Sequence, residues 1–186
     1  MNDEIKDLEK QGFIETIKKH KTIFASTIGI FFLILLSLFI YQEYQKKKIR
    51  QISDSFNKAL ILIQKNENKQ ASKILEEIIK TKNNFYSVSA LNLVVEKQLF
   101  NNKNKILENF DFVINKSNLD KETKNLVIFK KILFLGKEID EKTLLDNLNP
   151  IIQSNSVWKN TVTNYIKKYY LSKKEYIKAR EFGSIN

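Results

Sequence analysis

Two hydrophobic patterns divide this chain. Residues 22–41 read TIFASTIGIFFLILLSLFIY and contain no charged side chain, whereas from residue 46 onward apolar side chains recur at helical spacing among charged ones. Twenty helical residues rise about 30 Å, the thickness of the hydrocarbon core of a bilayer. The pattern therefore predicts an all-α protein, with a single N-terminal transmembrane helix at 22–41 followed by a helical domain.

The apolar run at 22–41 has two alternative explanations. A buried core helix rarely stays apolar on every face over such a length. A cleaved signal peptide has a shorter apolar region and small residues at its cleavage site, but this run ends in Leu-Phe-Ile-Tyr and no small-x-small pattern follows. We therefore interpret the run as a retained anchor, with Tyr41 and Tyr44 at the level of the lipid headgroups.

Residues 1–21 form a short leader ahead of the anchor. Its apolar residues stand among Lys, Asp and Glu, which fits an interfacial amphipathic helix on the membrane surface and equally fits a loosely ordered tail. Four basic residues stand near each end of the anchor: Lys10, Lys18, Lys19 and Lys21 before it, and Lys46, Lys47, Lys48 and Arg50 after it. Charge alone therefore permits either orientation in the membrane.

Residues 46–186 read as amphipathic helices joined by short polar turns. The low counts of 4 Gly and 1 Pro disfavour an all-β fold, which needs many tight turns. Gly136 would end one helix and Pro150 would bend or shorten another. The apolar spacing predicts helices at 49–64, 69–80, 86–100, 105–114, 122–135, 142–152, 158–171 and 174–182. Leu126, Phe129 and Leu133 mark the expected core-facing stripe of the helix at 122–135.

These helices form pairs that recur at a regular spacing. The second helix of each pair starts near Asn68, Lys103, Asp140 and Lys173, at intervals of 35, 37 and 33 residues. Two helices in about 34 residues are typical of tetratricopeptide repeats. Small residues stand at motif positions in the first pair (Ala59 and Ala71) and in the last (Ala179). In the second pair Asn104 or Lys105 occupies that position, and in the third Thr143 lies near it. We expect a tetratricopeptide-like helical-hairpin solenoid, with an irregular helical bundle as the alternative.

Composition and motifs offer no catalytic machinery. The chain has no Cys and one His, His20, which lies among lysines beside the anchor. There is no glycine-rich phosphate loop and no metalloprotease or hydrolase motif. The acidic pairs Glu76–Glu77 and Asp140–Glu141 read as a solvated helix face and a helix start. We therefore predict no catalytic residue, no metal and no cofactor, and a protein that is not an enzyme.

The net charge of +11 raises the question of an anionic partner. The lysines are scattered along the predicted helices rather than gathered in one arginine-rich block, which disfavours a nucleic-acid interface.

An aromatic stripe offers the best candidate for a partner surface. Trp158, Tyr165 and Tyr169, with Tyr170 beside them, recur along the helix at 158–171. Such a stripe is more often core than ligand site, but its exposed members would suit protein–protein contact, and the concave side of stacked first helices is the expected surface.

Three segments carry a resemblance to a known family. The leader DEIKDLEKQGFIETIKKHKTIF runs directly into the anchor, the helix QISDSFNKALILIQ follows it, and then comes ASKILEEIIKTKNNFYSVSALNLVVEKQLFNNKNK. Together they resemble the YfgM-like family, the ancillary subunit of the bacterial SecYEG translocon. The resemblance implies a single-pass protein of the bacterial inner membrane, with its N-terminus in the cytoplasm and its repeats in the periplasm. It implies an interaction scaffold that links exported proteins to periplasmic chaperones.

Two other functions remain open at this point. An envelope-assembly or cell-division adaptor would share the same architecture. A membrane-tethered enzyme would need a pocket carboxylate or histidine, and the sequence offers no candidate for it. The sequence leaves the clients, the oligomeric state and the binding surface undefined.

Overall fold

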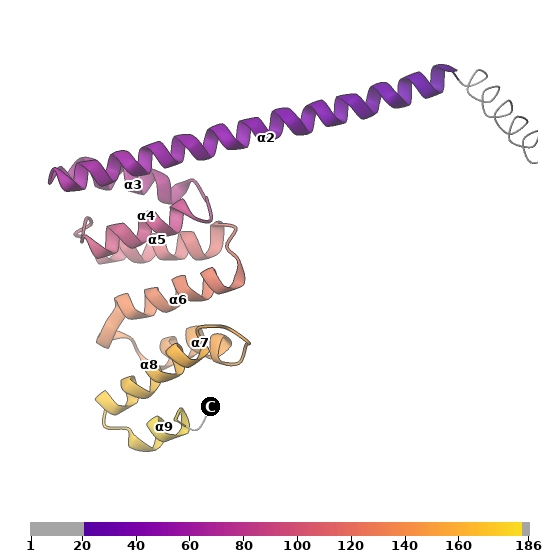
Figure 1. Ribbon diagram of the computed structural model, residues 1–186. Helices are drawn as coiled ribbons and strands as arrows, with labels where there is room; N and C mark the ends of the chain where they lie inside the picture. Colours follow the sequence, from indigo (N-terminus) through magenta and orange to yellow (C-terminus); the bar gives the residue numbers. More distant parts are fainter. Residues whose placement is uncertain (1–20, 184–186) are drawn as a thin grey trace, which may run out of the picture. The chain divides into compact units, whose positions relative to one another are not determined.

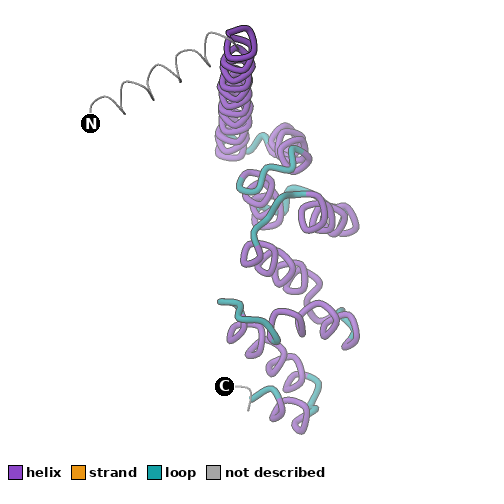
Figure 2. Tube along the Cα trace, turned by 90° about the vertical axis from the view of Figure 1, so that its right-hand side faces the viewer, coloured by secondary structure: helices purple, strands orange, loops and turns teal. Residues whose placement is uncertain are grey.

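The fold comes from a computed structural model that describes residues 21–183. The structure is 80% helical, and its described residues contain helices and loops but no strand (Figure 2). The all-α prediction is therefore confirmed. The predicted leader lies, apart from Lys21, outside the described residues, and so does His20.

Eight α-helices and one short 3-10 helix follow one another between residues 21 and 183 (Figure 1). They are α2 (Lys21–Gln64), α3 (Asn68–Lys80), α4 (Tyr86–Glu96), α5 (Lys103–Lys116), α6 (Lys121–Leu135), η1 (Gly136–Glu138), α7 (Glu141–Ile152), α8 (Lys159–Ser172) and α9 (Tyr176–Glu181). The chain divides into two compact units, Met1–Gln51 and Ile52–Asn186.

Helix α2 is longer than the sequence pattern suggested. We expected the anchor at 22–41 and a separate first domain helix at 49–64, but one helix of 44 residues includes both. The connecting residues QEYQKKKIR contain neither Gly nor Pro and consist mainly of good helix formers, so nothing in them ends a helix.

The N-terminal part of α2 is long and apolar enough to cross a membrane, and no other helix in residues 21–183 is. None of the side chains in its apolar window is buried, and Leu33, for example, is 67% exposed. This segment is therefore not part of the core of the chain. Exposed apolar side chains on every face are the pattern expected of a helix in contact with lipid.

Short turns join the helices of unit Ile52–Asn186, and three of them share one geometry. Asn66, Gln98 and Lys174 take positive φ angles of 61°, 51° and 63° just after α2, α4 and α8. The next residue in each turn donates its N–H to a carbonyl five residues back: Glu67 to Leu62, Leu99 to Val94, and Glu175 to Tyr170. This is the Schellman pattern of helix ends. Gly136, at φ 62°, ends α6 as predicted.

Two of the other turns begin their helices with side-chain caps. Asp120 accepts hydrogen bonds from the N–H groups of Glu122 and Thr123 at the start of α6. Asp140 accepts one from Thr143 at the start of α7, 2.8 Å away. The capping role expected for Asp140 is confirmed.

The core of this unit consists of two clusters that meet at α6. Val127 belongs to the first cluster, with residues of α2, α3, α4 and α5. Phe129 and Ile132 belong to the second, with residues of α7, α8 and α9. Positions 127 and 129 lie on opposite sides of a helix, because two residues turn it by about 200°. Helix α6 therefore buries two faces, whereas the other helices bury mainly one stripe.

Three sequence expectations need correction here. Leu133 is not in the core-facing stripe, because α6 buries the two faces on either side of it and leaves it 46% exposed. Helix α4 ends at Glu96 rather than at residue 100, and a left-handed turn at Gln98 follows it. Pro150 does not shorten α7, which continues for two more residues to Ile152. Proline removes one backbone N–H, and here the missing hydrogen bond falls in the last turn of the helix.

Candidate partner-binding groove

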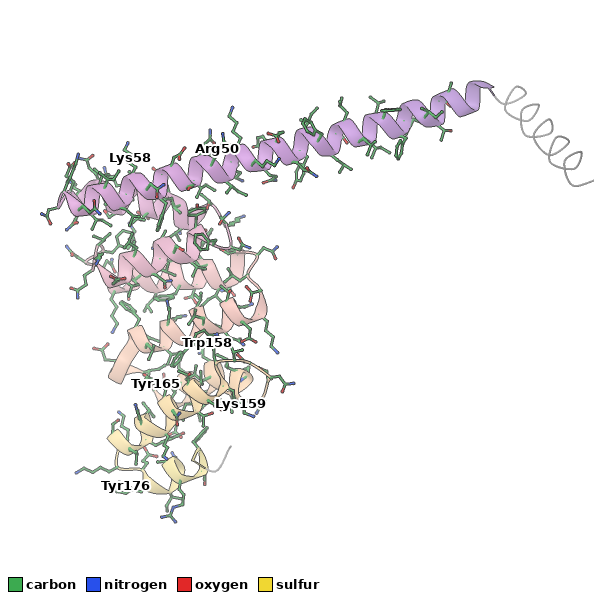
Figure 3. All side chains as sticks on the ribbon, viewed as in Figure 1. Arg50, Lys58, Trp158, Lys159, Tyr165 and Tyr176 are labelled. Carbon is green, nitrogen blue, oxygen red and sulfur yellow. The ribbon has the colours of Figure 1, made fainter. Side chains whose placement is uncertain are left out.

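Of the three aromatic residues singled out by the sequence, Tyr165 and Tyr169 lie on α8 and Trp158 immediately precedes it; all three are half-buried. Figure 3 shows Trp158 and Tyr165 at separate places along this helix. Trp158 donates from Nε1 to the backbone carbonyl of Glu122 at the start of α6, 3.1 Å away. The indole therefore holds two helices together, and it does not line the cleft that contains the two tyrosines.

A small polar network surrounds the indole. The carboxylate of Glu122 accepts hydrogen bonds from the Ser156 hydroxyl at 2.6 Å and from the Val157 N–H at 3.1 Å. Asn125 also donates to the Ser156 oxygen, at 3.1 Å. These residues fix the loop before α8 against α6. Sequence reasoning missed them, because residues 31 to 36 positions apart come together only when the two helices lie side by side.

Tyr165 and Tyr169 lie together at a surface cleft of about 450 Å³. The Tyr165 ring meets Phe129 of α6 edge-on, with centroids 5.5 Å apart. The Tyr169 hydroxyl donates to the carbonyl of Ile139 at 3.3 Å. The same cleft is lined by Leu133 and Gly136 from α6 and its end. Two of the three predicted residues therefore share one site.

A second cleft of about 370 Å³ lies between α4 and α6. Leu133 lines it too, together with Val95 and the polar side chains of Asn92 and Lys130. Lys130 donates to the Asn92 amide oxygen at 2.9 Å and so joins the two helices across the cleft. Because the clefts share Leu133, we treat them as one surface, the α4–α6–α8 groove.

Basic side chains dominate the charge of this groove. Lys168 and Lys173 line the α6–α8 cleft, and Lys173 Nζ lies 5.6 Å from the centre of the Tyr169 ring. Lys130 and Glu96 line the α4–α6 cleft. Burial lowers the pKa of Lys130, and the nearby charge of Glu96 partly reverses that shift. Burial also raises the pKa of the Tyr165 hydroxyl.

Beyond the groove, a hydrogen-bonded network attaches the last helix. The Tyr170 hydroxyl donates to Glu141 Oε1 at 2.9 Å, and Lys178 Nζ donates to both oxygens of that carboxylate, at 2.8 and 2.9 Å. Burial, and then the bond to Glu141, raises the pKa of Tyr170 to about 12. Glu141 was expected only to favour a helix start, so this second role is a correction.

In the other acidic pair, Glu76–Glu77, one carboxylate faces solvent and the other forms an ion pair. Glu77 is exposed, and Glu76 accepts a hydrogen bond from Lys105 of α5 at 2.6 Å. Within residues 21–183, no three His, Cys, Asp or Glu side chains gather as metal ligands.

This chain was compared with protein-family models, curated proteins and solved structures, and it matches none of them.

Proposed function

We propose that this chain is a membrane-anchored scaffold for protein–protein interactions and not an enzyme. The observation that carries the proposal is the α4–α6–α8 groove, where the exposed Leu133 and half-buried apolar and aromatic side chains from three different helices line one surface. Surfaces of this kind, built from every second helix of a stack, ordinarily bind extended segments or helices of partners.

In this proposal, the helices from residue 52 onward form a tetratricopeptide-like solenoid of hairpins. Contacts between alternate helices support it. Lys105 reaches Glu76 over 29 residues, Lys130 reaches Asn92 over 38, and Lys178 reaches Glu141 over 37. Each bond joins equivalent helices of neighbouring pairs at about the length of one repeat. The Schellman turns after α2, α4 and α8 add a recurring connection within the pairs.

The anchor in this proposal is residues 22–41, retained as a single transmembrane helix. Its exposed apolar side chains support this role, together with the absence of a small-x-small cleavage pattern after it. The resemblance to the YfgM-like family adds the bacterial inner membrane, a cytoplasmic N-terminus and a periplasmic domain. It also supplies the proposed partners, the SecYEG translocon and periplasmic chaperones.

Affinity purification from gently solubilised membranes tests this function. The bait is the full chain, and the control carries the same residues 1–51 fused to an unrelated soluble domain. We expect translocon subunits or a periplasmic chaperone with the full chain and not with the control. Recovery of other envelope proteins alone would favour the envelope-assembly or cell-division adaptor. If the two baits recover the same proteins, the scaffold proposal fails.

A further inference from the structure

We propose that the α4–α6–α8 groove binds an acidic segment of a partner protein, with one apolar side chain of that segment seated on Leu133. This inference rests on the proposed scaffold function and specifies the chemistry of its partner. An acidic segment is the occupant that the charges around the groove favour.

The apolar part of the site is centred on Leu133. This side chain is 46% exposed and lines both clefts, so a partner residue placed there would cover a leucine that α6 leaves open. Tyr165 and Tyr169 form the wall on the α8 side, and both are held in place by contacts with Phe129 and Ile139. Rigid aromatic rings of this kind provide contact area at low cost in conformational entropy.

Gly136 lines the α6–α8 cleft at the end of α6. A Cβ built on Gly136 would meet no atom within 4 Å, so the space above this backbone is unfilled. The positive φ of 62° turns the chain away at this point, a conformation that glycine adopts most readily.

Two lysines give the α6–α8 cleft its charge. Lys168 and Lys173 are exposed, and neither forms an ion pair with another residue in the described part of the chain. Among the residues that the structure describes, no carboxylate lines this cleft. Two basic groups beside an apolar floor complement a segment that alternates acidic and apolar side chains.

The three carboxylates whose charges act on Tyr169 are already engaged elsewhere. Glu141 and Glu175 both bind Lys178, and Asp140 accepts the N–H and hydroxyl hydrogen bonds of Thr143. Burial raises the pKa of Tyr169, and the negative charges of these three carboxylates raise it further. They do not line the cleft, so Lys168 and Lys173 remain available to a partner.

In the α4–α6 cleft, Lys130 and Glu96 oppose each other. Lys97 forms an ion pair with Glu96 at 2.9 Å and therefore offsets that carboxylate as well. The charge of the whole groove is thus basic, and its basic groups concentrate on the α8 side.

Peptide binding to the full chain in nanodiscs of zwitterionic lipid tests the inference. The probes are three short fluorescent peptides of equal length that alternate Leu with Glu, Gln or Lys. We expect the Glu–Leu peptide to bind most tightly, and added salt to weaken it. The double variant Lys168→Gln/Lys173→Gln should weaken it roughly five- to tenfold, as expected for the loss of two exposed ion pairs.

The matched control is Lys167→Gln/Lys174→Gln, which removes the same charge from exposed neighbouring positions outside the cleft. We expect it to leave binding within about twofold, and circular dichroism checks the folding of both variants. Equal loss in the two variants, or no binding of any peptide, would overturn the inference.

The variant Leu133→Asp separates this inference from the scaffold function. If Glu–Leu and Gln–Leu peptides bind equally and both lose affinity in this variant, the groove binds apolar segments without regard to charge. The acidic inference then fails while the scaffold function stands. The purification experiment decides the scaffold function independently of the charge of the peptides.

Discussion

Trp158 Nε1 donates a hydrogen bond to the backbone carbonyl of Glu122, 36 residues earlier in the chain. Seven residues further along both helices, Tyr165 meets Phe129 at the same separation of 36. Helices α6 and α8 therefore run in the same direction and are offset by one constant number of residues. Such an offset is expected where the same structural unit is repeated and stacked.

The first prediction concerns the left-handed turn after α4. Gln98 has a φ of 51°, which costs a residue with a Cβ about 1 kcal/mol relative to glycine. We expect Gln98→Gly to raise the free energy of unfolding by about that amount, measured by urea denaturation.

The matched control for this prediction is Lys97→Gly. Lys97 precedes Gln98 and has an ordinary φ of −90°, so glycine there adds flexibility to the unfolded chain and also removes the exposed ion pair with Glu96. We expect this control to lower stability. If both variants lower it equally, the turn does not have the proposed geometry.

Most of the helical pattern could be predicted from the sequence. The expected helix at 69–80 corresponds to α3 at Asn68–Lys80, because its apolar residues follow one clear stripe. The turns could not be predicted in the same way. Residues such as Gln98 and Lys174 seldom take a positive φ, so nothing in the sequence marks them as left-handed turns.

The second prediction is a late phenol titration. Tyr170 is 1% exposed and has a pKa of about 12, against an ordinary value of 10.0. The folded state holds the phenolic proton more tightly than the unfolded chain. Its contribution to stability is therefore complete below pH 10 and is lost as the pH rises through about 12.

Ultraviolet titration of the phenols in the detergent-solubilised chain measures the pKa of Tyr170. Of the seven tyrosines, we expect one to ionise near pH 12, and we expect Tyr170→Phe to remove that last step. Tyr165→Phe is the control, because that ring lies at the groove and not in the Glu141 network. An unchanged final step in Tyr170→Phe would contradict the assignment.

The third prediction is that residues 22–41 remain in the membrane after synthesis. Extraction of membranes at alkaline pH releases peripheral and soluble proteins but not helices that span the hydrocarbon core. We expect the full-length chain in the pellet. A variant with three leucines of the anchor changed to Lys should be released, because each charge at the centre of the helix costs about 2.5–3.5 kcal/mol. A shortened, soluble wild-type product would instead indicate a cleaved signal peptide.

The fourth prediction is the orientation of the domain. A reporter that is active only in the periplasm, fused after Asn186, should be active. A second fusion, with a reporter active only in the cytoplasm, should be silent at the same position. The reverse pattern would place the helices from residue 52 onward in the cytoplasm, and the proposed contact with periplasmic chaperones would then be ruled out.

The candidate site could be predicted only in part. Tyr165 and Tyr169 were recognised as an aromatic stripe and do line the groove. Trp158 has the same periodicity, but its indole bonds to α6 instead. Leu133 was expected in the core, because one stripe was assumed for α6; a helix packed on both sides has two buried faces.

The final prediction tests the groove as a partner-binding surface, which is the central claim. A photo-crosslinking amino acid replaces Leu133 in the full chain, and a second chain carries it at Lys142. The Lys142 side chain is 85% exposed on α7, outside the groove. After irradiation of native membranes, crosslinked proteins are identified by mass spectrometry. We expect translocon subunits or a periplasmic chaperone from position 133 and not from position 142. If position 133 gives no specific crosslink, or the same ones as position 142, the account of this groove is wrong.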